Sequence, residues 1–271
     1  GKGQRTNFKW EFGKTKNLYR VGFYEPYINE KTSGGFNIYN ERTKETSIEK
    51  GDYNKTETGI DATLGRKLGE DLRGYFKLRI YDTAEDYEDE AMTFSLVKDT
   101  RDFFLRPSSG SRREIAVEVA PEWLGSTAPF NRYLVDYSKY FKIGSGGQVL
   151  ALHGRSGYLH STGETGKLLE SELFKVGGPD TVRGYDYSAF QGEALLVLNA
   201  EYRFRITDNL DGVLFYDLGN AWTQPDTLKF SEMHQGYGLG VRIDTPVGVM
   251  RIDYGIGEEG GKTYFSLGQT F

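Results

Sequence analysis

The chain has 271 residues, a formal net charge of −5 and no cysteine. The lack of cysteine excludes disulfide frameworks, thiolate metal sites and cysteine nucleophiles, and three histidines leave little for another metal centre. The negative charge argues against a nucleic-acid-binding protein, which needs a basic face to displace the counterions of phosphate groups. We therefore expect no metal, no cofactor and no nucleic-acid partner.

The composition favours many strands joined by turns, because tyrosine (19), phenylalanine (17) and glycine (35) are abundant while proline (7) is scarce. No run of the sequence approaches the roughly 20 apolar residues that a membrane-spanning helix needs. The mean hydropathy of −0.57 is nevertheless compatible with a membrane β-barrel. Only alternate residues of each strand of such a barrel face lipid, and the others face a polar interior.

Apolar and polar residues alternate with a period of two from the first strand onward, which is the signature of a two-sided strand. In the segment 7–12 the aromatic residues take one parity and the polar residues the other. The pattern is sharpest in the segments 196–205 and 251–256, where the opposite parity carries charges. The residues that this alternation assigns to a lipid-facing surface are Phe8, Trp10, Phe12, Leu198, Tyr202, Phe204, Ile252 and Tyr254.

Counting such segments predicts about fourteen strands. They lie near residues 5–13, 17–28, 34–44, 56–68, 71–83, 91–101, 112–122, 131–143, 147–159, 193–206, 211–222, 236–245, 248–257 and 263–271. The predicted fold class is all-β, an antiparallel transmembrane β-barrel. A soluble sandwich or propeller would also alternate, but aromatic residues at strand ends and the many charges on the opposite parity favour the barrel.

The stretch from about residue 160 to 192 interrupts this series. Loops longer than about 12–15 residues are uncommon in compact domains and tend to be functional or disordered. The stretch contains the segment 176–185, Val-Gly-Gly-Pro-Asp-Thr-Val-Arg-Gly-Tyr. Function is therefore expected to concentrate in this loop.

Three further segments accompany the loop in a fixed order. Asp99-Thr100-Arg101-Asp102, followed by Pro107 and Gly110, precedes the loop; Phe-Tyr-Asp-Leu-Gly-Asn at 215–220 and Gly-Leu-Gly-Val-Arg-Ile-Asp-Thr-Pro-Val-Gly at 238–248 follow it. Together these elements resemble the BamA/TamA superfamily of outer-membrane barrels, from about residue 91 to the end. The loop then corresponds to the superfamily's signature loop, which tucks into the barrel.

The resemblance implies a role for the loop motif Val182, Arg183, Gly184 and Tyr185. In the family the loop arginine pairs with acidic residues on the strand walls, so Arg183 is expected to contact Glu201 and Asp217. A guanidinium can bridge two carboxylates with directed bonds, whereas a solvated surface arginine is the alternative. The other charged residues that point inward by parity are expected to form an interior charge network rather than a catalytic group; they are Asp99, Arg101, Arg242, Arg251 and Asp253.

The final strand ends on an aromatic residue, with Phe265, Leu267 and Phe271 on one parity. This pattern resembles the C-terminal β-signal of bacterial outer-membrane barrels, and it implies location in the bacterial outer membrane. Gly268 in this strand, with Gly255 and Gly257 beside it, is expected to weaken packing at the seam of the barrel.

Family barrels have sixteen strands, and residues 1–5 resemble the segment before their third strand. We therefore expect residues 1–271 to form one barrel domain with a long lumen-directed loop at about 160–192. The periplasmic domains of the family, and the first two strands, are expected to be absent from the chain.

By this resemblance the protein is expected to be a BamA-like assembly barrel, which folds and inserts β-barrel proteins through a lateral seam by adding a strand to an exposed edge. The expected partners are the outer-membrane lipid bilayer, unfolded outer-membrane protein substrates and accessory assembly lipoproteins. The alternatives are a TamA-like or two-partner secretion translocation barrel, and a passive porin-type channel. An enzyme would have to rest on acidic pairs such as Glu114 and Glu118, which no nucleophile accompanies.

Overall fold

The computed structural model describes residues 3–11, 16–47, 51–83, 87–164, 166, 168–224, 228–245, 248–268 and 271. Within these ranges nearly all regular structure is β-strand, with short 3-10 turns at η1 (Glu122–Leu124), η2 (Glu170–Glu172) and η4 (Phe230–Glu232). None of the described helical turns is long and apolar enough to cross a membrane.

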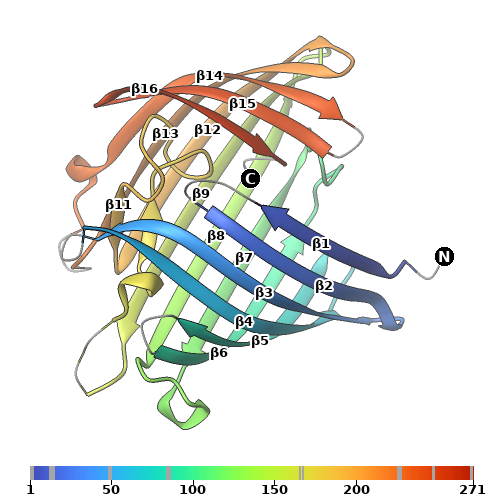
Figure 1. Ribbon diagram of the computed structural model, residues 1–271. Coiled ribbons are helices and arrows are strands. Elements are labelled where there is room, and N and C mark those ends of the chain that lie inside the picture. The colour runs from blue at the N-terminus through green and yellow to red at the C-terminus, as the bar shows by residue number, and fades with distance from the viewer. Residues whose placement is uncertain are drawn as a thin grey trace. The chain divides into compact units, whose positions relative to one another are not determined.

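Fourteen of the described strands form one antiparallel sheet, whose order follows the chain (Figure 1). They are β1 (Arg5–Glu11), β2 (Lys16–Asn29), β3 (Thr32–Ser47), β4 (Gly51–Lys67), β5 (Leu72–Thr83), β6 (Tyr87–Asp99), β7 (Gly110–Ala120), β8 (Phe130–Ile143), β9 (Gln148–Ser161), β12 (Ala194–Thr207), β13 (Leu210–Trp222), β14 (His234–Thr245), β15 (Gly248–Gly257) and β16 (Gly260–Leu267). The long loop between β9 and β12 carries two further strands, β10 (Phe174–Val176) and β11 (Phe190–Gly192), which pair with each other.

The predicted fourteen strands are thus confirmed, with boundaries that differ by a few residues. The last strand departs most from its prediction at 263–271, because β16 begins at Gly260 and ends at Leu267. The short pair β10–β11 was not predicted, since three residues are too few to show a period.

The chain packs into two compact units. The first comprises Gly1–Val97, Ala116–Tyr133 and His160–Glu172, and the second comprises Lys98–Ile115, Leu134–Leu159 and Leu173–Phe271.

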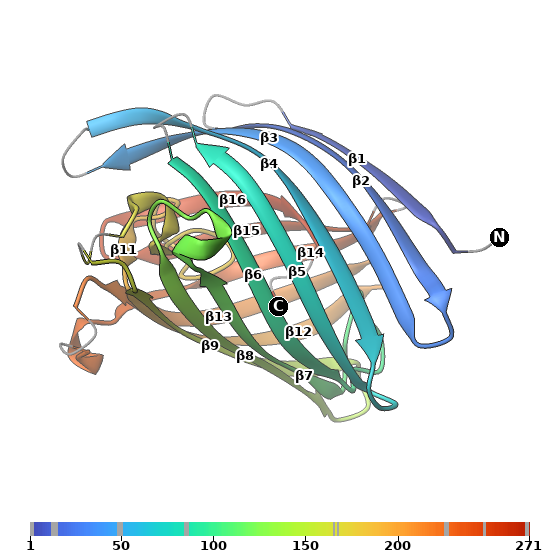
Figure 2. The same ribbon diagram turned by 90° about the horizontal axis from the view of Figure 1, so that it is seen from below.

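Alternation divides the sheet of the first unit into a buried face and an apolar exposed face. Its strands β1 to β5 lie side by side (Figure 2). Ile38, Ile60 and Ile80 pair across β3, β4 and β5 and are all exposed, whereas the neighbouring Tyr39 and Tyr81 are buried. Water would not favour an exposed isoleucine row, but lipid would.

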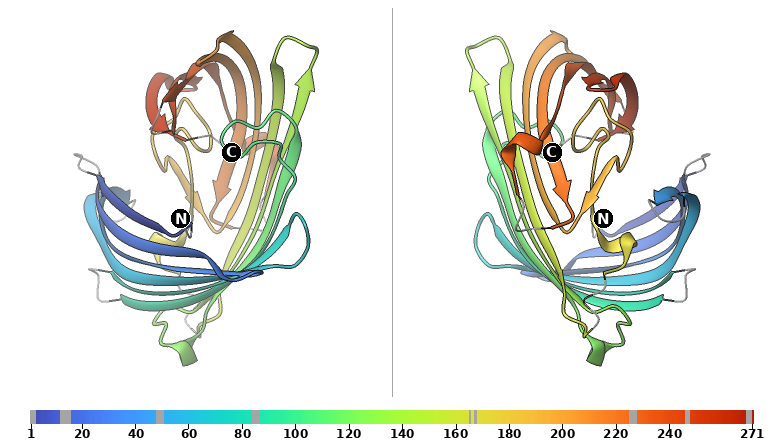
Figure 3. Two further views of the ribbon diagram at one scale, coloured as in Figure 1. Left: turned by 90° about the vertical axis from the view of Figure 1, so that its right-hand side faces the viewer. Right: turned by 90° about the vertical axis from the view of Figure 1, so that its left-hand side faces the viewer.

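The second unit shows the same alternation more strictly. In β12, Val197, Asn199 and Glu201 are buried, while Leu198 and Tyr202 are exposed by 41% and 37%. The loop segment 174–192 packs against the buried side, on the concave face of β12 to β16 (Figure 3). This face is called the inner face below.

The residues assigned to the lipid-facing surface agree with this division wherever the structure describes them. Phe8, Leu198, Tyr202 and Tyr254 are exposed, and Phe204 and Ile252 are half-buried on the same parity. Phe12 and the side chain of Trp10 lie outside the described residues.

Candidate functional site

The tip of the long loop is shaped by glycines and closed by local hydrogen bonds. The β10–β11 pair brings Val176 opposite Phe190, so the two ends of the segment between them lie side by side. Gly177 has a φ of 116°, and its N–H donates to Thr181 Oγ1 at 2.8 Å. A Cβ on Gly177 would lie 2.4 Å from the Asp186 oxygen. Only glycine satisfies both the left-handed backbone and this close approach.

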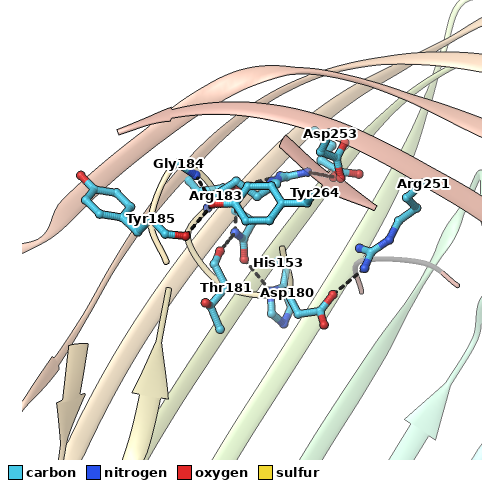
Figure 4. A network of polar contacts seen from close by, with 12 residues as sticks. His153, Asp180, Thr181, Arg183, Gly184, Tyr185, Arg251, Asp253 and Tyr264 are labelled. Carbon is cyan, nitrogen blue, oxygen red and sulfur yellow. Dashed lines mark hydrogen bonds and ion pairs between the residues drawn. The ribbon is translucent and has the colours of Figure 1, made fainter. Parts of the chain in front are cut away.

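Arg183 projects from this tip onto the inner face and is fully buried (Figure 4). Its Nε and Nη2 donate to the two carboxylate oxygens of Asp217 at 2.7 and 2.8 Å, and its Nη1 donates to Glu201 Oε1 at 2.7 Å. Its backbone N–H also donates to Asp217 Oδ2 at 3.1 Å. The structure therefore brings the predicted arginine together with both of the acidic residues named for it, in the two-pronged geometry that favours arginine over lysine.

The strand register explains why these partners meet the loop. Glu201 lies opposite Phe215 across β12 and β13, and Asn199 lies opposite Asp217. The Phe215 ring lies beneath the guanidinium, 3.5 Å from Arg183 Cζ to the ring centroid, which adds a cation–π contact. Asn199 Nδ2 donates to Asp217 Oδ1 at 2.8 Å and to the Thr181 oxygen at 2.6 Å. Asn199 was not predicted as a site residue, although it has the same parity in the strand as Glu201 and so could have been expected on the buried face.

Further charges extend the site along the inner face. Arg203 and Arg242 approach Glu201 at 2.7 and 3.2 Å, and Arg242 also binds Asp253 at 2.6 Å. Arg183 lies 3.7 Å from Asp253. Burying a charge is costly unless it is paired and hydrogen-bonded, and here three arginines meet three carboxylates. The arrangement ties Arg183 of the loop to carboxylates of β12, β13 and β15.

Of the predicted interior charge network, Arg242 and Asp253 join the Arg183 site directly. Arg251 binds the loop residue Asp180 at 2.6 Å, which ties a second point of the loop to β15 (Figure 4). Asp99 and Arg101 pair with each other at 2.7 Å where β6 ends.

Glycines on β14 and β15 form a slot for the loop backbone. A Cβ on Gly236 would lie 1.8 Å from the Arg183 oxygen, and one on Gly255 would lie 2.7 Å from the Gly184 nitrogen. A Cβ on Gly257 would lie 2.8 Å from the Gly184 oxygen. Gly255 and Gly257 were expected to weaken the seam, but the structure places them against the loop, where they permit backbone-to-backbone approach.

Tyr264 of β16 completes the anchoring of the motif. Its hydroxyl donates to the Tyr185 oxygen at 2.6 Å and accepts from the Gly184 N–H at 2.9 Å. The Tyr185 hydroxyl donates in turn to the Gln235 oxygen at 2.9 Å. Val182 is buried beside Tyr185 in the apolar cluster under the loop. Tyr264 was not predicted as a site residue, because the sequence around a strand tyrosine does not indicate which loop its hydroxyl will contact.

Phe265, Leu267 and Phe271 share one parity of the sequence, but Phe265 and Phe271 do not share one face in the structure. Phe265 is 62% exposed on the outer face, whereas the ring of Phe271 lies on the inner face against His153. Gly268, which follows β16, has a φ of 97°, a backbone conformation outside the extended strand region. The side chain of Leu267 lies outside the described residues.

A second anchor for the loop lies in the first unit. Glu172, in η2, accepts hydrogen bonds from Tyr81 Oη at 2.8 Å and from Arg132 Nη2 at 2.6 Å, and Arg79 lies 3.6 Å away. Burial raises the pKa of Glu172, but the positive charges of Arg132 and Arg79 outweigh it and lower that pKa to about 2. Sequence reasoning missed this residue, because nothing in its local pattern distinguishes it from a solvated glutamate.

The two glutamates of the acidic pair considered for catalysis bind different arginines. Glu114 binds Arg112 at 2.5 Å, and Glu118 accepts from Arg79 at 3.0 Å. Within the described ranges no group of three histidine, aspartate or glutamate side chains is placed to hold a metal ion.

Comparison with known proteins decides the family. The sequence matches the Omp85 superfamily domain over residues 1–271. The chain belongs to the Omp85 superfamily. The resemblance indicated by the motifs is thus confirmed at the level of the superfamily.

Chloroplast proteins are among the curated sequences to which the chain is similar. The chain is 25% identical over 313 residues to "Outer envelope protein 80, chloroplastic" of Arabidopsis thaliana, an alignment that covers 99% of this chain and 41% of that protein. It is 28% identical to "Protein TOC75, chloroplastic" of Pisum sativum, over 65% of this chain and 23% of that protein. The chain therefore spans less than half the length of these relatives.

Solved structures share the Omp85 barrel fold. BamA from Haemophilus ducreyi lacking POTRA domains 1–3 matches with a TM-score of 0.78 at 17% identity, over 99% of this chain and 64% of that one. CdiB from Acinetobacter baumannii matches with a TM-score of 0.63 at 17% identity, over 93% of this chain and 50% of that one. The predicted fold class, an antiparallel β-barrel of the BamA type, is confirmed.

Proposed function

We propose that this Omp85 protein is an assembly barrel of the BamA type, which folds and inserts β-barrel proteins into an outer membrane. The observation that carries the proposal is the buried contact of Arg183 with Glu201 and Asp217. That contact fixes a glycine-rich loop against the inner face at a considerable desolvation cost. A passive pore gains nothing from such an anchor, whereas a protein that must hold its loop in one position while a substrate is handled does.

Three proposals accompany this one. The protein works in an outer membrane, bacterial in our reading, although the chloroplast envelope of its curated relatives is the natural alternative. Its partners are the lipid bilayer, unfolded barrel substrates and accessory lipoproteins. It performs no bond chemistry, since the buried carboxylates Glu201, Asp217 and Asp253 are bound to arginines and none is placed as a free acid or base.

A translocation barrel is the second candidate, and the match to CdiB supports it. The fold likeness to BamA extends over more of the chain and has the higher TM-score, which favours assembly. A translocation barrel would secrete a partner polypeptide without inserting it into the bilayer.

The test compares insertion of a barrel substrate by the full-length protein reconstituted in liposomes. Arg183→Ala should abolish most insertion while the strands stay folded, because Glu201 and Asp217 lose the charge that binds the loop. Arg183→Lys should rescue little, since an ammonium cannot reproduce the two-pronged contact. Arg205→Ala removes an exposed arginine from the same strand as Glu201 and should insert normally.

Full insertion by Arg183→Ala would refute the role assigned to the anchor. Secretion of a polypeptide without insertion would favour the translocation barrel, and a steady open conductance that is unchanged in Arg183→Ala would favour the passive channel.

A further inference from the structure

Three positively charged side chains gather on the outer face of the second unit. Lys98 lies at the end of β6, Arg113 near the start of β7 and Lys139 near the end of β8, and these strands follow one another in the sheet. Arg113 and Lys139 share the parity of Ile115 and Tyr137, which are exposed in the same two strands. Lys98 is itself exposed. We call the three side chains the basic patch, and the end of the strands where β8 turns into β9 at 144–147 the short-turn end.

Strand pairing sets two of these cations against each other. The Thr100 N–H donates to the Ser111 oxygen at 2.8 Å, and the Ser111 N–H donates to Thr100 Oγ1 at 3.0 Å. Continued by two residues along each antiparallel strand, this pairing sets Lys98 opposite Arg113 on one face. Like charges that lie directly opposite destabilise a sheet, so an anion bound between them would relieve the repulsion.

Aromatic rings accompany the other members of the patch. Arg113 Cζ lies 5.3 Å from the centroid of the Tyr137 ring, and Lys139 Nζ lies 5.4 Å from that of Phe141. Lys139 is two residues from Tyr137 on the same strand and therefore on the same face. The rings attract the two cations but do not cancel their charge, so the charge stays available to a ligand.

The acidic residues nearest in sequence do not balance the patch. Asp99 binds Arg101 at 2.7 Å and Glu114 binds Arg112 at 2.5 Å, and these four residues have the opposite parity in the chain to Lys98 and Arg113. The described outward positions of β7 and β8 carry no carboxylate. The counter-charge of the patch therefore has to come from outside these strands.

The cations are also confined to one part of the outer face. At the same end of β12, β13, β14 and β15 the outward positions are apolar, as at Phe204, Leu214, Val241 and Ile252. Charges on a lipid-facing surface are tolerated only toward its edges, where long side chains reach the headgroups. Three of them on adjacent strands, beside an apolar face, match the boundary between hydrocarbon and phosphate.

We propose that Lys98, Arg113 and Lys139 bind the phosphate group of an anionic phospholipid in the leaflet at the short-turn end. A guanidinium binds phosphate through two parallel hydrogen bonds, and the two ammonium groups add point charges. The exposed Ile115 and Val135, next along the outer face, provide an apolar surface for the acyl chains. The inference requires the membrane barrel but not the assembly activity.

Lipid binding to the full-length protein in maltoside micelles tests the patch without any insertion step. The probe is phosphatidylglycerol with a fluorescent acyl chain, and the control is phosphatidylcholine with the same label, whose headgroup has no net charge. The unaltered protein should bind phosphatidylglycerol saturably and at least about tenfold more tightly than phosphatidylcholine, since each cation at a membrane surface contributes about fivefold. Raising the salt concentration should reduce this preference.

Substitutions separate the patch from the general charge of the protein. Arg113→Gln should weaken phosphatidylglycerol binding about fivefold, whereas Arg113→Lys keeps the charge and should lose less. Lys98→Glu sets a carboxylate opposite Arg113 and should abolish the preference. The matched control is Arg66→Gln, because Arg66 is exposed beside the short turn at 68–71 but lies opposite the uncharged Thr32 and Gly74. Phosphatidylcholine binding should be the same in all these variants, which reports an intact outer face.

Equal affinity of the unaltered protein for the two lipids would overturn the proposal and would leave the patch to an acidic surface of a partner protein. Displacement of phosphatidylglycerol by an equal concentration of inorganic phosphate would overturn it too, since the site would then recognise the free anion. An Arg66→Gln protein as impaired as Arg113→Gln would show that general charge, and not the patch, selects the lipid. Failure of the insertion assay would leave the lipid result standing, so the two proposals fall separately.

Discussion

The long loop is held at two places, and the two anchors use opposite charges. In the second unit the loop contributes a cation, Arg183, and the strands contribute the carboxylates of Glu201 and Asp217. In the first unit the loop contributes a carboxylate, Glu172, and the strands contribute the guanidinium groups of Arg79 and Arg132. The same loop thus presents a positive charge to the strands of the second unit and a negative charge to those of the first.

The anchors differ in how completely they are removed from water. The side chains of Arg183, Glu201 and Asp217 are 0% exposed. Those of Arg79 and Arg132 remain 19% and 18% exposed around Glu172. Losing a partner costs most where no water can replace it, so the Arg183 anchor should be the stronger and the Glu172 anchor the more readily released.

The largest expected effect is the loss of Asp217. Asp217→Ala leaves the buried Arg183 without three of its donated bonds, so the loop should lose roughly 3–5 kcal/mol of its free energy of local opening. Hydrogen exchange of the amides at 177–189 measures that opening. Arg183→Ala should cost a similar amount, and the double variant little more than either, because the pair acts as one unit.

Additive costs in the double variant would show that the two residues stabilise the loop independently. Arg205→Ala provides the comparison, since loss of this exposed arginine should change the opening free energy by less than about 0.5 kcal/mol.

A smaller effect is expected from the backbone slot, which none of the described glycines provides around Glu172. Gly236→Ala places a methyl group 1.8 Å from the Arg183 oxygen, so the loop must shift at a cost of roughly 1–3 kcal/mol. The same hydrogen-exchange experiment should show faster exchange at 177–189. Gly154→Ala adds a methyl group at 3.4 Å from a leucine side chain and should leave the loop unchanged. Equal exchange in Gly236→Ala and the unaltered protein would mean that the loop does not depend on this approach.

These comparisons show what could be predicted from the sequence. The alternation of apolar and polar residues predicted the strands, because the face on which a strand residue lies depends only on its local position. Together with the loop motif, the alternation also predicted that Arg183 meets Glu201 and Asp217. Glu172 lies in a segment with no period, and its partners are separated from it by 40 and more positions, as Arg132 is. No local pattern records such a contact.

The face of Glu201 was predicted correctly and that of Phe271 wrongly, and both predictions rest on the alternation of faces along a strand. Parity predicts a face only while the backbone stays extended, and Gly268 takes a φ of 97°. A glycine three residues from an aromatic end was visible in the sequence, but its conformation was not. The glycine slot could not be predicted either, because glycines in a strand show only that another backbone can approach closely, and here that backbone belongs to the loop.

Glu172→Gln tests the weaker of the two loop anchors. The substitution keeps an oxygen for the Tyr81 hydroxyl but removes the charge that faces Arg132 and Arg79. Because these arginines are partly hydrated, the cost should be about 1.5 kcal/mol, less than for Asp217→Ala. Proteolysis of the segment 160–172 should become faster in proportion, while exchange at 177–189 stays as in the unaltered protein. Loss of protection at both places would show that the two anchors are not separate.

The smallest effect, and the one that distinguishes the anchors without any substitution, is acid release of Glu172. The folded pKa of about 2 lies below the ordinary value of 4.5, so the folded protein binds fewer protons than the unfolded chain in the interval between them. The stability that this carboxylate contributes is therefore complete above about pH 4.5 and declines as the pH falls toward about 2. Pepsin cleavage within 160–172, measured across that interval, should accelerate as the pH falls, after correction for the enzyme's own activity on an unfolded substrate. Glu172→Gln should already be susceptible at the upper end and should lose the pH dependence. If the unaltered protein and Glu172→Gln show the same pH profile, the anchor at Glu172 does not hold the loop by its charge.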